Sequence, residues 1–384
     1  SGDFFAPIAA MKNLEQITTG GFQGSFPKGL SNMSQLLKLR LNNSTNIFSP
    51  LDVSKMTSLT NLDFNKIGIV EIVGIDKLKK LKTFKLKTMS LGDEWCYRKS
   101  GKNLVTPTIP SGINTLDSLK HLSLDGFKDL EQLPADLLST SMKLEILEVC
   151  NMEKLTSLPQ LSNSLKQLKL YSIGKKNMSP TFELSEQIGD ISSLEEISFT
   201  SGSGLTRLPK SLEKLKWLKE LKICDALFEE MQLDFSKLMY LKDAEFSNCS
   251  NLKTLGNVSM CTALQRLILK NNKKLNTWDV EALSKMSNLR RVEITGSSGL
   301  HLYAKGELLY LMGRVRNPAK DSYDRDTEKL CDGAFLCDLT EEQAVNENRL
   351  IDVGCRKCSY GSDHCHKFST DNDVAMKYEF YKRK

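Results

Sequence analysis

Cysteine and histidine are concentrated near the end of the chain, in residues 331–366, and these side chains could form disulfides or hold a metal. Few large apolar residues accompany them, so this segment has little core of its own. Short segments that are rich in cysteine and poor in core residues are typical of disulfide-stapled extracellular domains. We therefore predict at least two disulfides in this segment. The candidate cysteines are Cys331, Cys337, Cys355, Cys358 and Cys365.

A zinc site in the same segment is an alternative to the favoured prediction, which is disulfides without a metal. Cys355-x-x-Cys358 has the spacing of one arm of a structural zinc site, whereas Cys331 and Cys337 are too far apart for the usual second arm. Zinc would require thiolates that are reduced and bound to the metal. Free thiols are the third alternative. The candidate zinc ligands are Cys355, Cys358, His364, Cys365 and His366.

A catalytic use of these side chains has weaker support. Cys365 stands between two histidines in the sequence, but a nucleophile and its base must meet in space, and adjacency in sequence is weak evidence for that. The chain has no Gly-x-x-x-x-Gly-Lys phosphate loop, no His-Glu-x-x-His zinc helix and no Gly-x-Ser-x-Gly nucleophile elbow. We predict that the protein is not an enzyme and takes no cofactor. A cysteine-based enzyme is the competing hypothesis.

Length and composition limit the elements that position these residues. A chain of 384 residues is too long for one ordinary hydrophobic core, so it forms two or three domains or an elongated repeat. The net charge of +6 is mild and no long basic run accompanies it, which argues against a nucleic-acid partner. No stretch contains the roughly 18 apolar residues that a membrane-spanning helix requires. The start at Ser1, without Met, fits either a removed signal peptide or a cut chain.

An internal repeat dominates the sequence. The pattern Leu-x-x-Leu-x-Leu, with other apolar residues as substitutes, recurs mostly every 21 to 25 residues. Its last four residues alternate polar and apolar, which predicts a short strand with one buried face. One copy cannot cover its own apolar side, so neighbouring copies must stack. The copies start at Leu36, Leu59, Leu81, Leu119, Leu144, Leu165, Leu194, Leu218, Leu241, Leu264 and Leu289, and a degraded first copy starts at Leu14.

This pattern resembles the leucine-rich repeat family over about residues 11–303. The resemblance implies an α/β repeat fold, a curved solenoid of about twelve repeats with a parallel concave sheet and a small Cys-rich C-terminal cap. The expected parts are an N-terminal lead at 1–13, the repeats at 14–303 with an insertion near 91–110, and a cap at 304–384 that contains the Cys-rich segment 331–366.

The segments that return from one strand to the next are expected to lack long helices. Leu133-Pro134 and Leu208-Pro209 lie in such segments, and proline stops a helix and presets a turn. In the leucine-rich repeat family an Asn or Cys follows each strand and bonds to neighbouring backbones, and here only Cys249 and Asn272 fit. We therefore expect irregular loops at that edge. The cysteines expected as free thiols in the repeats are Cys96, Cys150, Cys224, Cys249 and Cys261.

Three shorter stretches resemble narrower groups within this family. The tail that contains the late cysteines resembles secreted oomycete-type leucine-rich repeat proteins, which implies an extracellular microbial effector or surface recognition protein. Residues 24–30 (Gly-Ser-Phe-Pro-Lys-Gly-Leu) resemble plant extracellular repeats. Residues 119–134 resemble the repeats of plant nucleotide-binding immune receptors, which implies the cytoplasmic alternative, a fragment of an intracellular receptor. A structural or adhesive surface protein is a further alternative, and a secreted protein is the expectation.

The outward strand positions provide the candidate binding surface. Side chains alternate between the faces of a strand, so these positions form columns across the sheet. Along the columns a basic zone is followed by an acidic zone and a second basic zone, while Ile146, Tyr171 and Ile268 are apolar. Banded charge with apolar residues suits a host or receptor protein, whereas nucleic acid would need a uniform basic stripe. The predicted partner-binding residues are Lys38, Arg40, Lys85, Lys87, His121, Ile146, Glu148, Tyr171, Glu196, Glu220, Asp243, Glu245, Arg266, Ile268 and Arg291.

Overall fold

The computed structural model covers most of the repeat region and one short piece of the tail. The described residues are 5–21, 23–24, 27–47, 50–69, 71–88, 108–138, 143–174, 182–200, 205–275, 286–295 and 350–354. The chain divides into two compact units, Ser1–Leu194 and Glu195–Lys384.

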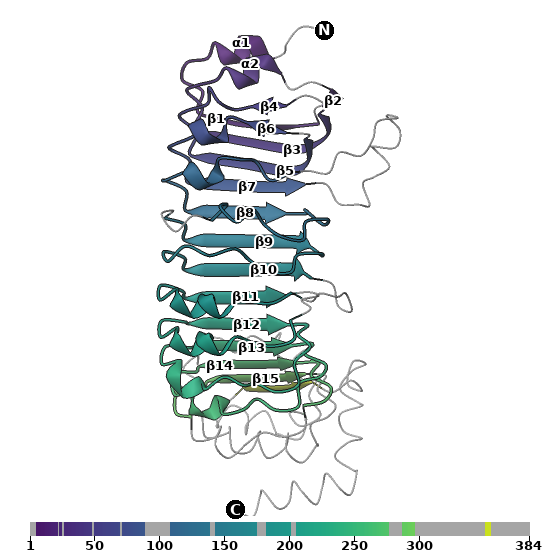
Figure 1. Ribbon diagram of the computed structural model, residues 1–384, viewed down its shortest axis with the longest axis vertical. Coiled ribbons are helices and arrows are strands. Elements are labelled where there is room, and N and C mark those ends of the chain that lie inside the picture. The colour runs from purple at the N-terminus through teal and green to yellow at the C-terminus, as the bar shows by residue number, and fades with distance from the viewer. Residues whose placement is uncertain are drawn as a thin grey trace, which may run out of the picture. The chain divides into compact units, whose positions relative to one another are not determined.

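The first unit is built on a parallel sheet to which each repeat contributes one main strand (Figure 1). The main strands, in spatial order, are β1 (Gln16–Gly20), β3 (Lys38–Ile47), β5 (Asn61–Ile69), β7 (Thr83–Thr88), β8 (His121–Asp125), β9 (Ile146–Met152) and β10 (Gln167–Ile173). The small strands are β2 (Gln23–Gly24), which pairs with β3, and β4 (Leu51–Asp52), which pairs with β6 (Ile72–Val73). The helices are α1 (Phe5–Ala9), α2 (Lys28–Ser31) and the 3₁₀ helices η1 (Ile75–Lys77), η3 (Ile113–Thr115) and η4 (Glu186–Asp190).

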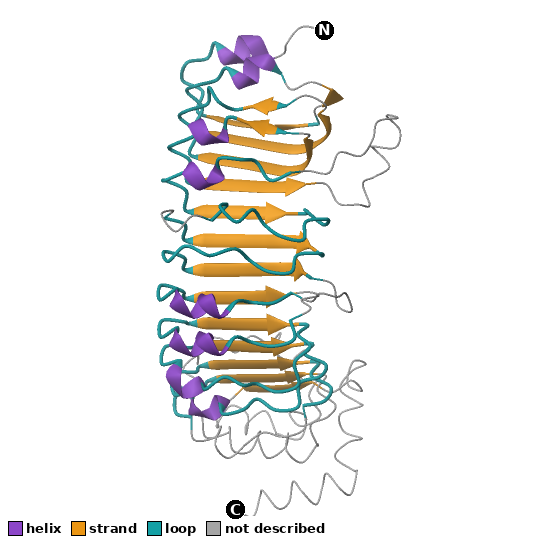
Figure 2. Ribbon diagram, in the orientation of Figure 1, coloured by secondary structure: helices purple, strands orange, loops and turns teal. Residues whose placement is uncertain are grey.

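The second unit repeats the same arrangement, with parallel strands and short helices in the returning segments (Figure 2). Its strands, in spatial order, are β11 (Glu196–Thr200), β12 (Glu220–Cys224), β13 (Asp243–Ser247), β14 (Arg266–Lys270), β15 (Arg291–Thr295) and β16 (Leu350–Gly354). Its 3₁₀ helices are η5 (Lys210–Lys214), η6 (Phe235–Lys237) and η7 (Val258–Met260).

The repeated leucines form the core because they occupy the inward positions of the strands. In β8, Leu122 and Leu124 are fully buried, while the alternate side chains of His121, Ser123 and Asp125 are only partly buried. Leu119, which starts the same copy, is also fully buried. Each buried side chain of this size contributes about 1.5–3 kcal/mol by leaving water. The predicted leucine-rich repeat solenoid with a parallel sheet is confirmed.

The returning segments fold as predicted, without long helices in the described residues. Pro209 holds an extended conformation, with φ −65° and ψ 134°, directly before η5. Two other 3₁₀ helices begin at side-chain caps, because Ser185 accepts a hydrogen bond from the N–H of Gln187 and Asp234 accepts one from the N–H of Ser236. Proline and capping side chains thus fix where these short helices begin.

The turn that follows each strand is more regular than the sequence suggested. A residue with left-handed backbone is followed directly by a buried residue in eight repeats, so expecting irregular loops was wrong for these turns. The register does shift beyond Ser44 in β3 and beyond Asn65 in β5, where irregularity was correctly expected. The left-handed residues are Asn43, Lys66, Gly126, Asn151, Ser172, Asp225, Asn248 and Asn271. The buried residues that follow them are Ser44, Ile67, Phe127, Met152, Ile173, Ala226, Cys249 and Asn272.

One segment of the tail adds a strand to the second unit. β16 pairs in parallel with β15, from Arg291 opposite Leu350 to Thr295 opposite Gly354. The rest of the expected cap, with its five cysteines and two histidines, lies outside the described residues, as does most of the insertion expected near 91–110. Within the described residues, no helix combines the length and the apolar character needed to cross a membrane.

Candidate functional site

The outward strand positions line up in register in the first unit. The column that contains Lys38 continues through His121 to Ile146 and Gln167, one residue per strand from β3 to β10. The column that begins with Arg40 passes through Lys85 to Glu148, and a third column places Lys87, Asp125, Cys150 and Tyr171 on adjacent strands. The backbone therefore brings the predicted residues of this unit onto one face.

His121 and Glu148 lie close together in an enclosed part of this face. Nε2 of His121 lies 3.2 Å from Oε2 of Glu148, and both side chains are less than a quarter exposed. The imidazole of His121 lowers the pKa of Glu148 to about 2, against the opposing effect of burial, and Lys85 assists. A carboxylate that is held in its charged form here can accept hydrogen bonds from a partner.

A second pair, Lys87 and Asp125, lies one column further along the strands. Nζ of Lys87 is 2.6 Å from Oδ2 of Asp125, and Oδ1 of Asp125 accepts a hydrogen bond from the side chain of Asn151. Cys150 is the strand neighbour of Asp125, and burial raises the pKa of its thiol to about 12. A thiol with such a pKa is protonated at neutral pH, so Cys150 is a poor nucleophile.

The early zone of the face is less basic than the sequence indicated. Arg40 lies 3.3 Å from Asp63 on the neighbouring strand, and Lys87 is paired with Asp125. Sequence reasoning missed both acidic partners. Their signal is that each occupies the same column as its cation, one strand further along.

The acidic zone of the second unit is also partly neutralised. Glu196, Glu220 and Asp243 stand side by side in one column, and Arg266 and Arg291 continue it. Arg266 forms an ion pair with Asp243. In the next column, Lys222 lies 3.1 Å from Glu245, an ion pair in which sequence reasoning missed the lysine.

The apolar residues of the face differ in their exposure. Ile146 and Tyr171 are half-buried on β9 and β10, so both present part of their surface to solvent. Ile268 is only 5% exposed on β14. Ile268 therefore does not offer the exposed apolar surface that was expected of it, although its column position is as predicted.

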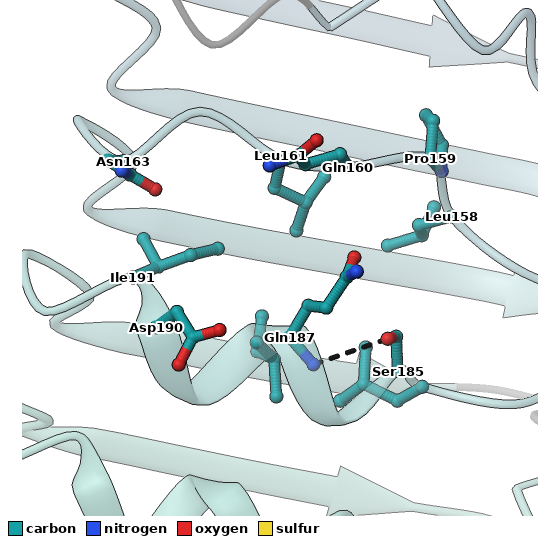
Figure 3. A pocket seen from close by; sticks show the side chains of 11 residues that line it. Leu158, Pro159, Gln160, Leu161, Asn163, Ser185, Gln187, Asp190 and Ile191 are labelled. Carbon is teal, nitrogen blue, oxygen red and sulfur yellow. Dashed lines mark hydrogen bonds between the residues drawn. The ribbon is translucent and has the colours of Figure 1, made fainter.

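A pocket of about 100 Å³ lies among the returning segments of the first unit (Figure 3). Leu161 and Ile191 contribute apolar walls, and Gln187 and Asp190 contribute polar groups. The hydroxyl of Ser185 accepts a hydrogen bond of 3.2 Å from the backbone N–H of Gln187, which fixes the start of η4 beside the pocket. Small-molecule sites usually enclose about 300–1,000 Å³, so this pocket is too small for most such ligands.

Candidate metal-ligating residues do not converge on a metal site within the part of the chain that the structure describes. No group of three His, Cys, Asp or Glu side chains there has the arrangement to hold a metal ion. Cys150, Cys224, Cys249 and Cys261 are free thiols, as predicted. The candidate disulfide and zinc residues of the tail lie outside the described residues.

Two curated proteins of Arabidopsis thaliana are similar to this chain, whereas no protein-family model matches it. One is a putative disease resistance protein, 26% identical over 294 residues, a match that covers 70% of this chain and 23% of that protein. The other is the protein SUPPRESSOR OF npr1-1, CONSTITUTIVE 1, which is 31% identical over 205 residues and covers 52% of this chain and 12% of that protein. The chain therefore spans less than a quarter of either relative.

Solved structures with similarity to the chain include bacterial and plant proteins. An internalin from Listeria monocytogenes aligns with a TM-score of 0.44 and 18% identity, over 76% of this chain and 86% of that one. A leucine-rich repeat protein from Leptospira interrogans aligns with a TM-score of 0.40 and 21% identity, over 81% and 91%. The ectodomain of a plant membrane receptor kinase from Arabidopsis thaliana aligns with a TM-score of 0.44 and 18% identity, over 79% and 41%.

Proposed function

We propose that this leucine-rich repeat solenoid is a non-catalytic recognition module that binds another protein through the sheet face of its first unit. The observation that carries the proposal is that two half-buried apolar side chains, Ile146 on β9 and Tyr171 on β10, occupy outward positions of adjacent strands, in different columns. The face offers no group of catalytic residues with matched geometry in the described residues, but it does offer a patterned surface.

The charges around the two apolar residues define the partner. Ile146 neighbours His121 in its column, and Glu148 stands two residues further along β9. Lys85 lies on β7 in the column of Glu148, and Lys87 on the same strand is paired with Asp125. Apolar and aromatic side chains at the centre of a patch contribute most of the affinity for a protein, and surrounding charges orient it. We expect a partner with an apolar anchor flanked by charged groups that complement Lys85 and Glu148.

The setting that we propose is immunity. Two curated relatives bear names that refer to disease resistance or to a plant suppressor, and both are longer proteins than this chain. The disease-resistance relative supports one candidate, part of a longer plant immune protein. The cysteine-rich tail favours the other candidate, a secreted microbial effector or surface recognition protein. The identity of the partner separates the two.

The test compares proteins captured by the immobilised full chain and by three variants. Ile146→Asp and Tyr171→Asp place a charge in the apolar part of the face. Val73→Asp is the matched control, because Val73 is 40% exposed on β6, outside the outward columns. From plant and microbial extracts, we expect a protein that wild type and Val73→Asp retain and the other two lose at least tenfold. Equal capture by all four proteins would show that this face is not the binding surface.

The enzyme hypothesis has its own test. Serine substitutions at Cys355, Cys358 and Cys365 would abolish a hydrolytic or thiol-exchange activity if these cysteines were catalytic. We expect no such activity in wild type and unchanged capture of the partner by the folded triple variant. An activity that wild type has and the folded variant lacks would overturn the non-catalytic proposal.

A further inference from the structure

We propose a second interaction surface in the second unit, at the edge where the strands begin, which binds an acidic protein segment that carries apolar side chains. Its central feature is a pair of exposed aromatic rings. Trp217 is 52% exposed and Tyr240 is 41% exposed, and their rings stack with centroids 4.6 Å apart and planes 20° apart. We call Trp217, Met239 and Tyr240, with Lys216, Lys219 and Lys242, the aromatic edge.

The two aromatic residues occupy the same position in successive repeats. Trp217 directly precedes Leu218, and Tyr240 directly precedes Leu241, and both leucines are fully buried. The core therefore does not need the aromatic rings, since the leucines fill it. In the other repeats this position holds small or polar residues, namely Asn13, Gln35, Ser58, Lys80, Ser118, Lys143, Ser164, Ser193, Ala263 and Asn288. Two adjacent aromatic residues are thus a local departure from the repeat pattern.

Exposed apolar side chains of this size mark binding surfaces more often than they serve stability. Trp and Tyr are the residues that most often dominate the energy of protein interfaces. Met239 is 54% exposed next to Tyr240 in the chain, and its flexible thioether adapts to apolar side chains of different shape. A cluster of this kind on a folded repeat offers a preformed anchor site.

The charges of the aromatic edge select an acidic partner. Nζ of Lys219 lies 2.7 Å from Oε2 of Glu195, so this lysine is already engaged in an ion pair. Lys216 and Lys242 are exposed, and neither forms an ion pair with another described residue. The neighbouring Glu220 belongs to the outward column on β12 and is not part of the aromatic edge. Two lysines therefore remain available to carboxylates on either side of an apolar contact.

The backbone of this edge is already engaged, so the contact is made by side chains. The N–H groups of Lys242 and Asp243 both donate to the carbonyl of Lys219, at 2.9 and 3.1 Å. In the next repeat, the N–H groups of Gln265 and Arg266 donate to the carbonyl of Lys242 in the same way. An added β-strand would need free backbone groups at this place. A segment that inserts a side chain beside the rings needs none.

The ring geometry favours a protein over single-stranded nucleic acid. Nucleic-acid platforms present open ring faces on which successive bases stack, along a continuous basic groove. Trp217 and Tyr240 stack on each other, so each has one face occupied. Acidic protein segments need only the ring edges, the thioether and the lysines.

The experiment selects ligands from a phage-displayed library of random 12-residue peptides with the full chain as bait. We expect enriched peptides that combine Asp or Glu with Leu, Ile or Phe. The double variant Trp217→Ser/Tyr240→Ser uses the residue found at this position in other repeats, so it preserves the repeat pattern. It should weaken binding of a synthetic enriched peptide at least tenfold, and Lys216→Glu/Lys242→Glu should weaken it about fivefold. Circular dichroism of both variants checks that they fold.

Four outcomes would overturn the proposal. The first is the absence of any enriched peptide, and the second is equal binding of enriched peptides by wild type and the serine double variant. The third is a labelled 20-nucleotide oligo(dT) that binds to wild type but not to that variant, and the fourth concerns a control variant. The variant Ile146→Asp separates this surface from the proposed sheet face of the first unit, because it should leave peptide binding unchanged. Loss of peptide binding in Ile146→Asp would reassign the peptides to that sheet face and refute the aromatic edge.

Discussion

The side chain of Asn272 forms a hydrogen bond with the backbone of Cys249, in the turn of the preceding repeat. Its Oδ1 accepts a hydrogen bond from the N–H of Cys249 at 2.9 Å, and its Nδ2 donates to the carbonyl of Phe246 at 2.7 Å. Cys249 repeats the relationship one turn earlier, since its Sγ lies 3.7 Å from the carbonyl of Ile223. Both side chains are fully buried, so these contacts supply partners that water cannot reach.

Replacing Asn272 with alanine is expected to lower the free energy of unfolding by about 2–3 kcal/mol, because a backbone N–H and a carbonyl would stay buried without partners. Urea unfolding followed by circular dichroism measures the change. Lys273→Ala is the control, since Lys273 is exposed and adjacent. A loss of unfolding free energy no larger than that of the control would show that water or a backbone shift replaces the two hydrogen bonds of Asn272.

Gly74 and Gly21 separate two effects of adding a side chain. Both have left-handed backbone, with φ of 84° and 75°. A Cβ at Gly74 would lie 2.5 Å from the Cβ of Ser54, whereas a Cβ at Gly21 would have no neighbour within 4 Å. Gly21→Ala is expected to cost about 1 kcal/mol of backbone strain, and Gly74→Ala about 1–3 kcal/mol more because of the overlap. Equal losses in urea unfolding would mean that the backbone near Ser54 relaxes freely.

The Glu148 carboxylate is expected to make stability depend on acid pH. Its pKa in the folded protein is about 2, below its ordinary value of 4.5, so its contribution is present above pH 4.5 and is lost as the pH falls toward 2. The Glu148→Gln variant should be about 1–2 kcal/mol less stable at pH 7, a value reduced for partial exposure of the pair.

Urea unfolding at pH 7, 4 and 3 measures this dependence. The difference between wild type and Glu148→Gln should narrow from pH 4 to pH 3, while the exposed control Glu131→Gln should differ little from wild type at each pH. A difference that stays constant over this range would exclude the proposed role of His121 in holding the carboxylate charged.

Much of the fold was predictable because two features of each repeat independently indicate the strand: the spacing of the leucines and the alternation of polar and apolar residues. The in-register columns from Lys38 to Gln167 follow from that spacing alone. The regular turns had a signal that was not used. Asn43, Asn151, Asn248 and Asn271 precede the buried position in four repeats, and asparagine tolerates left-handed backbone.

The ion pairs and the burial of single residues were harder to predict. Lys87 and Asp125 are 38 residues apart across an insertion, so only the register of β7 and β8 brings them together. Ile268 is only 5% exposed at an outward position, where strand alternation predicts an exposed side chain. Binding of a partner by the columns stays a prediction.

The cysteines of the repeats are expected to resist alkylation in the folded protein. Burial raises the pKa of Cys249 to about 12 and those of Cys224 and Cys261 to about 11, so few thiolates exist at pH 8. Mass spectrometry after iodoacetamide treatment should find these residues, and Cys150, unmodified in native protein and modified in urea. Rapid native labelling of Cys249 would indicate local opening of the turn that Asn272 closes.

The tail cysteines are expected to behave in the opposite way, because at least two disulfides are predicted among them. Closing loops of about 15 residues contributes roughly 3 kcal/mol per bridge, which a segment with few core residues needs. Gly354 ends β16 beside Thr295, so the chain enters the Cys355-x-x-Cys358 motif directly from the last strand of the sheet.

Alkylation in urea, with and without prior reduction, shows which tail cysteines form disulfides. The repeat cysteines in the same samples serve as a comparison. At least four of Cys331, Cys337, Cys355, Cys358 and Cys365 should take up label only after reduction, while the repeat cysteines take it up in both samples. Serine at Cys331 should leave its former partner free. Five labelled thiols without reduction, together with one zinc per chain, would overturn the disulfides and remove the tail's support for an extracellular protein, since zinc requires reduced thiolates.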